Sequence, residues 1–183
     1  MKLIFVLLLF TGASCCYAQG LATPQVKQFL NEFVNNNEKA CNLYFEANPD
    51  SRLVDDLIKN LDDSVYRDMN NQKVAFILSP EEKEFIKEIS LSQKNKEWDS
   101  TLLEHATILK VKRPGENFTR EQAREYVQQF EGKYMIIFTI PAFLRNDTIC
   151  IFLYVSYGGG TIYIMKKENQ RWVKYLRRGI FVS

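Results

Sequence analysis

The chain has 183 residues, 46% of them hydrophobic, and a formal net charge of +2. This length supports one domain with a sizeable core, and the near balance of 24 basic and 22 acidic residues argues against nucleic-acid binding. Because His105 is the only histidine, the sequence supports neither a metal centre nor a catalytic triad. We therefore expect no metal and no cofactor.

The first residues resemble a cleavable leader. Lys2 supplies a positive start, residues 3–10 form a short apolar run, and Cys16-Tyr17-Ala18 places small residues where a signal peptidase reads them. We expect a signal peptide at residues 1–18, cleavage before Gln19, and a single domain over residues 19–183. The apolar run is too short to remain as a membrane-spanning helix.

Cys15 and Cys16 leave a second reading of the leader open, in which a lipidated cysteine anchors the protein in the envelope. However, Gly12 and Ala13 stand three residues before these cysteines, where a bacterial lipobox normally has leucine. We therefore expect soluble export to the periplasm or the extracellular space, with lipid anchoring as the alternative.

Two cysteines, Cys41 and Cys150, remain after the leader is removed. An exported protein can oxidise them to a disulfide. The alternative is a pair of separate buried thiols, because free cysteine is among the most buried residue types. The sequence leaves both alternatives open.

The region before residue 133 is expected to form mainly helices, which can cover one face of a C-terminal sheet. Residues 73–78 read either as a short strand or as a buried lead-in, and a strand is one reading of residues 107–111. Thr23-Pro24 predicts one helix start, and apolar residues at helical spacing follow over residues 26–34 and again over 53–61. Ser79, with Glu82 three residues later, predicts a capping box. Residues 90–99 are polar and indicate a loop, and Thr119 is expected to cap a further helix.

The last third of the chain predicts several strands in succession. Residues 134–140, 148–157, 161–167 and 171–178 are rich in β-branched and aromatic side chains. Turns are expected at residues 145–147 and 168–170, and a turn or bulge at the glycines 158–160. A strand follows these glycines, whereas a phosphate-binding loop requires a helix there. The sequence thus predicts an α+β fold, with N-terminal helices packed on a C-terminal antiparallel sheet of three to five strands.

The strand at residues 148–157 is apolar on both faces, which is typical of a central strand covered on both sides. The helices account for one cover. An aromatic concavity is one possibility for the other face, and its candidate lining residues are Tyr134, Phe152, Tyr154 and Tyr163.

Basic residues gather near the end of the chain. A functional patch that binds an anionic partner is one reading, and a solvated, charge-guarded edge strand is the other. With the turn at residues 145–147 included, the candidate partner patch consists of Arg145, Lys174, Arg177 and Arg178.

A resemblance adds to this reading. PAFLRNDTICIF at residues 141–152 and YIMKKENQRWVK at residues 163–174 resemble the closing half of small exported proteins of Bacteroidetes-type bacteria. Those proteins share a Pro-x-Phe-Leu-Arg-Asn turn, a Gly-rich bend and a Lys-Lys-x-x-Gly-x-Trp hairpin. The likeness covers residues 78–183. This chain departs from it with Gln170 in place of the usual glycine and lacks the extra cysteines of some relatives. The resemblance implies a bacterial envelope location and no reaction.

No combination of acid, base and nucleophile is visible, so the leading expectation is a non-catalytic binding or interaction domain of the bacterial envelope. Its partner would be a protein or a small molecule. A second hypothesis is an enzyme or ligand binder, because the last hairpin is also similar to that of cone-shaped domains of the nuclear-transport-factor-2 type. A third hypothesis is an envelope inhibitor or immunity-type protein.

Overall fold

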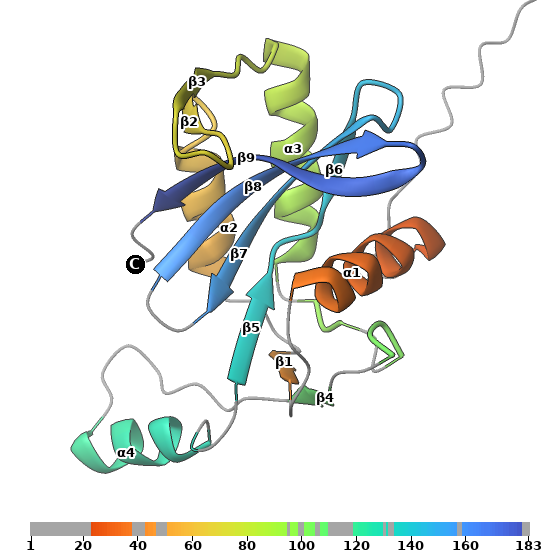
Figure 1. Cartoon of the computed structure of the whole chain (residues 1–183). Helices are drawn as coiled ribbons and strands as arrows, with labels where there is room; N and C mark the ends of the chain where they lie inside the picture. The colour runs from red at the N-terminus through yellow and green to blue at the C-terminus, as the bar shows by residue number, and fades with distance from the viewer. Residues whose placement is uncertain are drawn as a thin grey trace, which may run out of the picture.

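The computed structural model describes residues 23–37, 43–46, 51–94, 96–98, 101–104, 107–109, 119–129, 131, 134–156 and 159–180. Its helices are α1 Pro24–Asn37, α2 Ser51–Lys59, α3 Pro80–Gln93 and α4 Arg120–Gln128. Its strands are β1 Leu43–Glu46, β2 Val65–Arg67, β3 Lys73–Ala75, β4 Thr107–Leu109, β5 Tyr134–Phe138, β6 Ala142–Leu144, β7 Ile149–Ser156, β8 Gly159–Glu168 and β9 Arg171–Ile180. Figure 1 shows these elements along the chain.

The strands join in one sheet with the order β3-β2-β9-β8-β7-β5-β1-β4, and β6 pairs with β7 as well. β1 runs parallel to both β4 and β5, while all other pairs are antiparallel. The α+β class is therefore confirmed. The expected three to five strands were too few, because the region before residue 133 also contributes strands to the sheet. β3 and β4 lie within residues 73–78 and 107–111, where a short strand was one reading, whereas β1 and β2, at four and three residues, show too little alternation to be predicted.

β7 lies inside the sheet and is buried on both faces along residues 149–154. Successive side chains of a strand point to opposite faces, so Phe152 and Leu153 face different layers. On the face of Phe152 lies α1, whose Phe29 and Phe33 rings stand edge-on to the Phe152 ring at centroid distances of 5.3 and 5.1 Å. These rings are the centre of an aromatic cluster between α1 and the sheet.

The face of Leu153 is covered by α2 and α3, which contact each other and contact β7 and β6. In the view of Figure 1 these two helices lie behind the sheet. The cover of the second face, which the sequence left open, is thus also helical. The helices divide between the two faces, which is how a strand that is apolar on both sides becomes buried.

The predicted capping box begins α3. The Ser79 hydroxyl accepts a hydrogen bond from the Glu82 backbone N–H, and the Glu82 carboxylate accepts one from the Ser79 backbone N–H. The helix continues to Gln93, so the loop expected at residues 90–99 begins later. Gln93 is fully buried in the protein. Its side-chain N–H donates to the Phe138 carbonyl, and its side-chain oxygen accepts from the Ile140 backbone N–H, in the segment that joins β5 to β6.

Cys150 is a free thiol in the core, and its burial raises the pKa of that thiol well above the ordinary value. Cys41 lies outside the described residues. The structure therefore gives no support to a bridge between the two.

Tyr66 on β2 is a buried residue with an unusual feature. Its ring packs edge-on to Phe76, and its hydroxyl has no hydrogen-bond partner among the described residues. Burial raises the pKa of Tyr66 to about 12, because the phenolate would lose its hydration. In the unfolded chain the tyrosine hydroxyl titrates near pH 10. Above that pH the unfolded state loses this proton while the folded state still keeps it, so the folded state becomes less stable relative to the unfolded state.

We therefore predict that Tyr66→Phe leaves the free energy of unfolding at pH 7 unchanged or raises it by about 1 kcal/mol. The advantage of the variant should grow as the pH rises above 10, towards about 2–3 kcal/mol at most. Urea unfolding at pH 7 and pH 11 measures both effects. Tyr175→Phe, at an exposed position, is the matched control and should change stability by less than about 0.5 kcal/mol. A clear loss of stability in Tyr66→Phe at pH 7 would contradict an unpartnered hydroxyl.

Candidate anion-binding cleft

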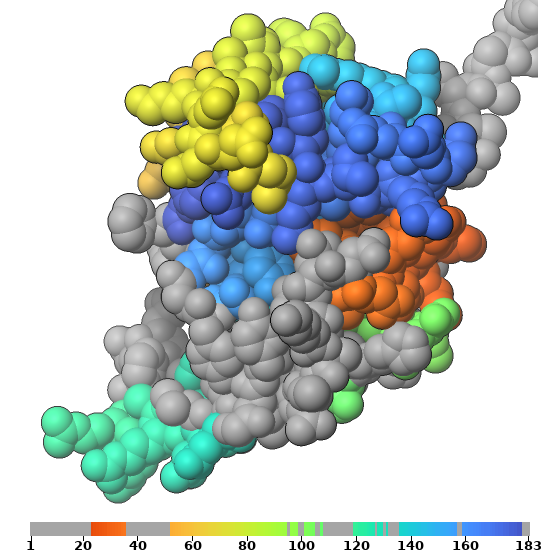
Figure 2. Space-filling view, viewed as in Figure 1, coloured from red at the N-terminus to blue at the C-terminus, as the bar shows by residue number. Residues whose placement is uncertain are grey.

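A cleft of about 410 Å³ opens where the loop after α2 meets the β2–β3 hairpin and the end of β9. In Figure 2 this hairpin, in yellow, lies against the dark blue of β9. The described lining residues are Asp62, Asp63, Ser64, Val65, Tyr66, Arg67, Lys73, Arg177, Arg178 and Gly179.

Three basic residues in this cleft occupy neighbouring positions across three strands. Lys73 on β3 is opposite Arg67 on β2, and Arg67 is opposite Arg177 on β9. Residues directly opposite one another share a face, with Cβ atoms roughly 4.5–5.5 Å apart. We call Lys73, Arg67 and Arg177 the basic row. Arg177 is in turn opposite Tyr163 on β8, so the row continues the sheet face that α1 covers farther along.

The hairpin that carries two members of the row is organised by Asp68. Its carboxylate accepts hydrogen bonds from the backbone N–H groups of Asn70 and Gln72, at 2.9 and 2.8 Å. Asn71 has a positive φ of 68°, a conformation that asparagine tolerates better than most residues. This tight turn sets Arg67 and Lys73 opposite each other on adjacent strands.

Both described acidic residues of the cleft form ion pairs with residues outside the basic row. Asp62 pairs with Lys83 of α3 at 2.7 Å, and Asp63 pairs with Arg178. Arg67 donates to the backbone carbonyl of Asn71 at 2.9 Å. Among the described residues, no carboxylate pairs with any member of the basic row.

This arrangement costs stability, because like charges directly opposite on neighbouring strands repel each other. The cost falls when an anion lies between them, since each guanidinium can offer two parallel N–H donors to one oxyanion and the lysine adds a point charge. The geometry can therefore bind an anionic group.

The cleft also has room beside the row. Gly179 has no side chain, and a Cβ placed there would meet no atom within 4 Å. Val65 is 54% exposed, so an apolar surface borders the same space. A ligand larger than a bare ion can thus contact both charge and apolar surface.

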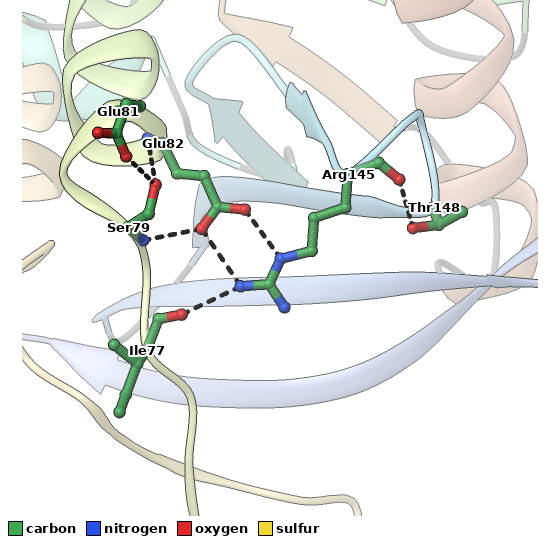
Figure 3. A network of polar contacts seen from close by, with 6 residues as sticks. All are labelled: Ile77, Ser79, Glu81, Glu82, Arg145 and Thr148. Atoms are coloured by element: carbon green, nitrogen blue, oxygen red, sulfur yellow. Dashed lines mark hydrogen bonds and ion pairs between the residues drawn. The ribbon is translucent and has the colours of Figure 1, made fainter.

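Arg145, a member of the predicted partner patch, belongs to a different network (Figure 3). Its Nε and Nη2 donate to the two oxygens of Glu82 at 2.8 and 3.2 Å, and Nη2 also donates to the Ile77 carbonyl at 3.0 Å. Its guanidinium lies 4.8 Å from the centre of the Phe76 ring. Arg145 therefore ties the turn after β6 to the N-terminus of α3, and its Nε and Nη2 donors are used in bonds within the protein.

The turn itself has an uncommon backbone. Arg145, Asn146 and Asp147 all have positive φ, between 53° and 59°. This conformation costs of order 1 kcal/mol for a residue with a side chain, least for asparagine and aspartate. The Thr148 hydroxyl donates to the Arg145 carbonyl at 2.7 Å and holds the turn closed. The Arg145–Glu82 pair provides a second, longer-range restraint.

The pKa of Glu82 is lowered, first by the hydrogen bond from Arg145 and also by the backbone bond from Ser79. The stabilisation linked to this shift is present above the carboxyl's unfolded pKa and is lost as the pH falls through the folded one. We predict that Arg145→Met lowers the free energy of unfolding by about 1 kcal/mol at pH 7, and that this difference shrinks below pH 4.

Urea unfolding at pH 7 and pH 3.5 tests this prediction. The matched control is Lys87→Met, which removes an exposed pair with Glu84 on the same helix and should cost less than about 0.5 kcal/mol. Equal losses in the two variants at pH 7 would show that the Arg145 network is an ordinary surface pair.

The other three residues of the predicted partner patch are not all in the cleft. Arg177 and Arg178 line the cleft, whereas the Lys174 ammonium lies 5.0 Å from the Tyr163 ring centre and 5.5 Å from that of Phe33. Of the predicted partner patch, therefore, only Arg177 and Arg178 line the cleft. Sequence reasoning did not find Arg67 and Lys73. A hairpin signal was present in Asp68 and Asn70-Asn71, but three-residue strands on either side gave it no context.

Of the predicted pocket residues, Phe152, Tyr154 and Tyr163 all contact Phe33 of α1, so a helix occupies the place proposed for a ligand. The side chain of Tyr134 and all of His105 lie outside the described part. Within the described ranges, no three metal-binding side chains come together. The helices in those ranges include none that is both long and apolar enough to span a bilayer.

Comparison with protein-family models, with curated proteins and with solved structures finds no match to this chain.

Proposed function

We propose that this chain is a non-catalytic binding domain of an exported bacterial protein, and that the cleft receives an anionic group of its partner. The observation that carries the proposal is the basic row, three cations at directly opposite positions with no described carboxylate as partner. The export part rests on residues 1–18, and the envelope location also on the resemblance of residues 78–183.

The residues of the cleft favour binding over catalysis. The two described carboxylates that line it, Asp62 and Asp63, are in ion pairs with Lys83 and Arg178, and neither is buried beside a nucleophile as a general base would be. The members of the row are permanently charged donors at neutral pH, which suits recognition of an oxyanion.

Substitutions in the basic row distinguish a binding site from a patch with a structural role only. Replacing one of its arginines removes a repulsion in the free protein and a donor in the complex. Such a substitution should raise stability and lower affinity together, as is common where a binding site is kept at a cost in stability.

We predict that Arg177→Gln and Arg67→Gln each weaken the binding of sulfate about tenfold or more, because each removes a charge-assisted contact. Arg177→Gln should also raise the free energy of unfolding by about 0.2–0.5 kcal/mol in low salt without sulfate, whereas Arg67→Gln gains less because it loses the bond to the Asn71 carbonyl. Titration followed by amide NMR shifts gives the affinity, with chloride at matched ionic strength as the reference.

Arg120→Gln and Arg124→Gln on the exposed face of α4 are the matched controls, since each makes the same change in net charge. They should leave sulfate binding within about twofold of the original protein. The proposal would be overturned if all four variants bound sulfate alike. It would also be overturned if the original protein did not bind sulfate at all.

A further inference from the structure

We propose that the anionic group held by the basic row is the terminal phosphate of an organic phosphomonoester. This inference rests on the proposed function and names its ligand class. Three features of the cleft carry it: the charge of the row, the number of its donors, and the space beside Gly179.

Charge comes first. The row offers three positive charges at adjacent positions. A carboxylate or a phosphodiester carries one negative charge and would leave most of the repulsion in place. A phosphomonoester carries about −1.5 to −2 at pH 7 and has three strong acceptor oxygens, so it can receive a donor from each member of the row.

The surroundings of the row argue for a single phosphate on a small organic body. Asp62 pairs with Lys83 but its side chain is 88% exposed, so its negative charge at the cleft disfavours a second phosphate or a polyanion. Val65 and the open space at Gly179 provide room and apolar contact for the remainder of the ligand. A cleft of about 410 Å³ is of the size that holds small molecules.

The ligand's own titration supplies a test. A phosphomonoester loses its second charge below its pKa near 6, whereas sulfate keeps two charges and a phosphodiester keeps one. The charged or titratable groups that line the cleft are Asp62 and Asp63 after α2, Tyr66 and Arg67 of β2, Lys73 of β3, and Arg177 and Arg178 of β9. Sulfate keeps both charges between pH 5 and pH 7.5, so any titration of the cleft itself would change the binding of sulfate as well. A change confined to the phosphomonoester therefore reports on the ligand.

The experiment is a titration of the protein with glycerol phosphate, dimethyl phosphate and sulfate at pH 7.5 and pH 5. We expect glycerol phosphate to bind about tenfold or more tightly than dimethyl phosphate at pH 7.5, and to lose about tenfold at pH 5. Sulfate should bind equally at both values, which shows that the cleft remains competent at pH 5.

Two outcomes separate this inference from the proposed function. If glycerol phosphate, dimethyl phosphate and sulfate all depend on Arg177 but bind alike and without a pH effect, the phosphomonoester inference is overturned and the anion-binding function stands. If none of the three binds, both are overturned.

Gly179→Val tests the organic part of the ligand, because a side chain there enters open space and leaves the row intact. The variant should weaken glycerol phosphate about fivefold or more while inorganic phosphate stays within about twofold. An equal effect on both ligands, or none on either, would overturn the assignment of the organic part to this space.

A phosphomonoester can be a free molecule or a lipid headgroup, and vesicles distinguish the two sources. Sedimentation with vesicles that contain phosphatidic acid, but not with vesicles of the diester phosphatidylglycerol, would identify a headgroup. Binding of glycerol phosphate without sedimentation would identify a free ligand. Equal sedimentation with both lipids, lost in Arg177→Gln, would overturn the monoester assignment.

Discussion

The burial of β7 on both faces is the constraint on which this structure depends. A strand of eight residues with no polar face requires a cover on each side, and the chain supplies α1 for one face and α2 with α3 for the other. Phe29 and Phe33 determine where α1 lies, because their rings interlock with those of β7 and its neighbours. The extent of α1 then determines which part of the sheet face stays open.

The candidate cleft lies where that cover ends. The aromatic cluster under α1 gives way, across β8 and β9, to the basic row on β9, β2 and β3. Tyr163 stands at the boundary, in contact with Phe33 on one side and opposite Arg177 on the other. One sheet face thus provides both core and the candidate binding surface. The difference lies in the side chains: rings where a helix covers the sheet, and unpaired cations where solvent reaches it.

Sequence patterns predicted the parts of this fold that depend on local signals. Spacing and capping chemistry act over a few residues. They therefore allow the sequence to predict the apolar stretch of β7, the Ser79 capping box and the turn at Arg145. The partner of Arg145 is Glu82, 63 residues earlier, and no local rule connects the two. The basic row was missed for a related reason, since strands of three residues are specified by what they pair with. Only the assembled sheet shows that Arg67 and Arg177 are neighbours.

The most direct test of the account is to observe the guanidinium groups themselves while a phosphomonoester binds. The NMR signals of the arginine Nε–H groups can be followed as glycerol phosphate is added at pH 7.5. The account predicts that the signals of Arg67 and Arg177 shift and saturate together, while that of Arg145, already bonded to Glu82, stays in place. A saturating shift at Arg145 with none at Arg67 and Arg177 would contradict it and place the site at Arg145 instead.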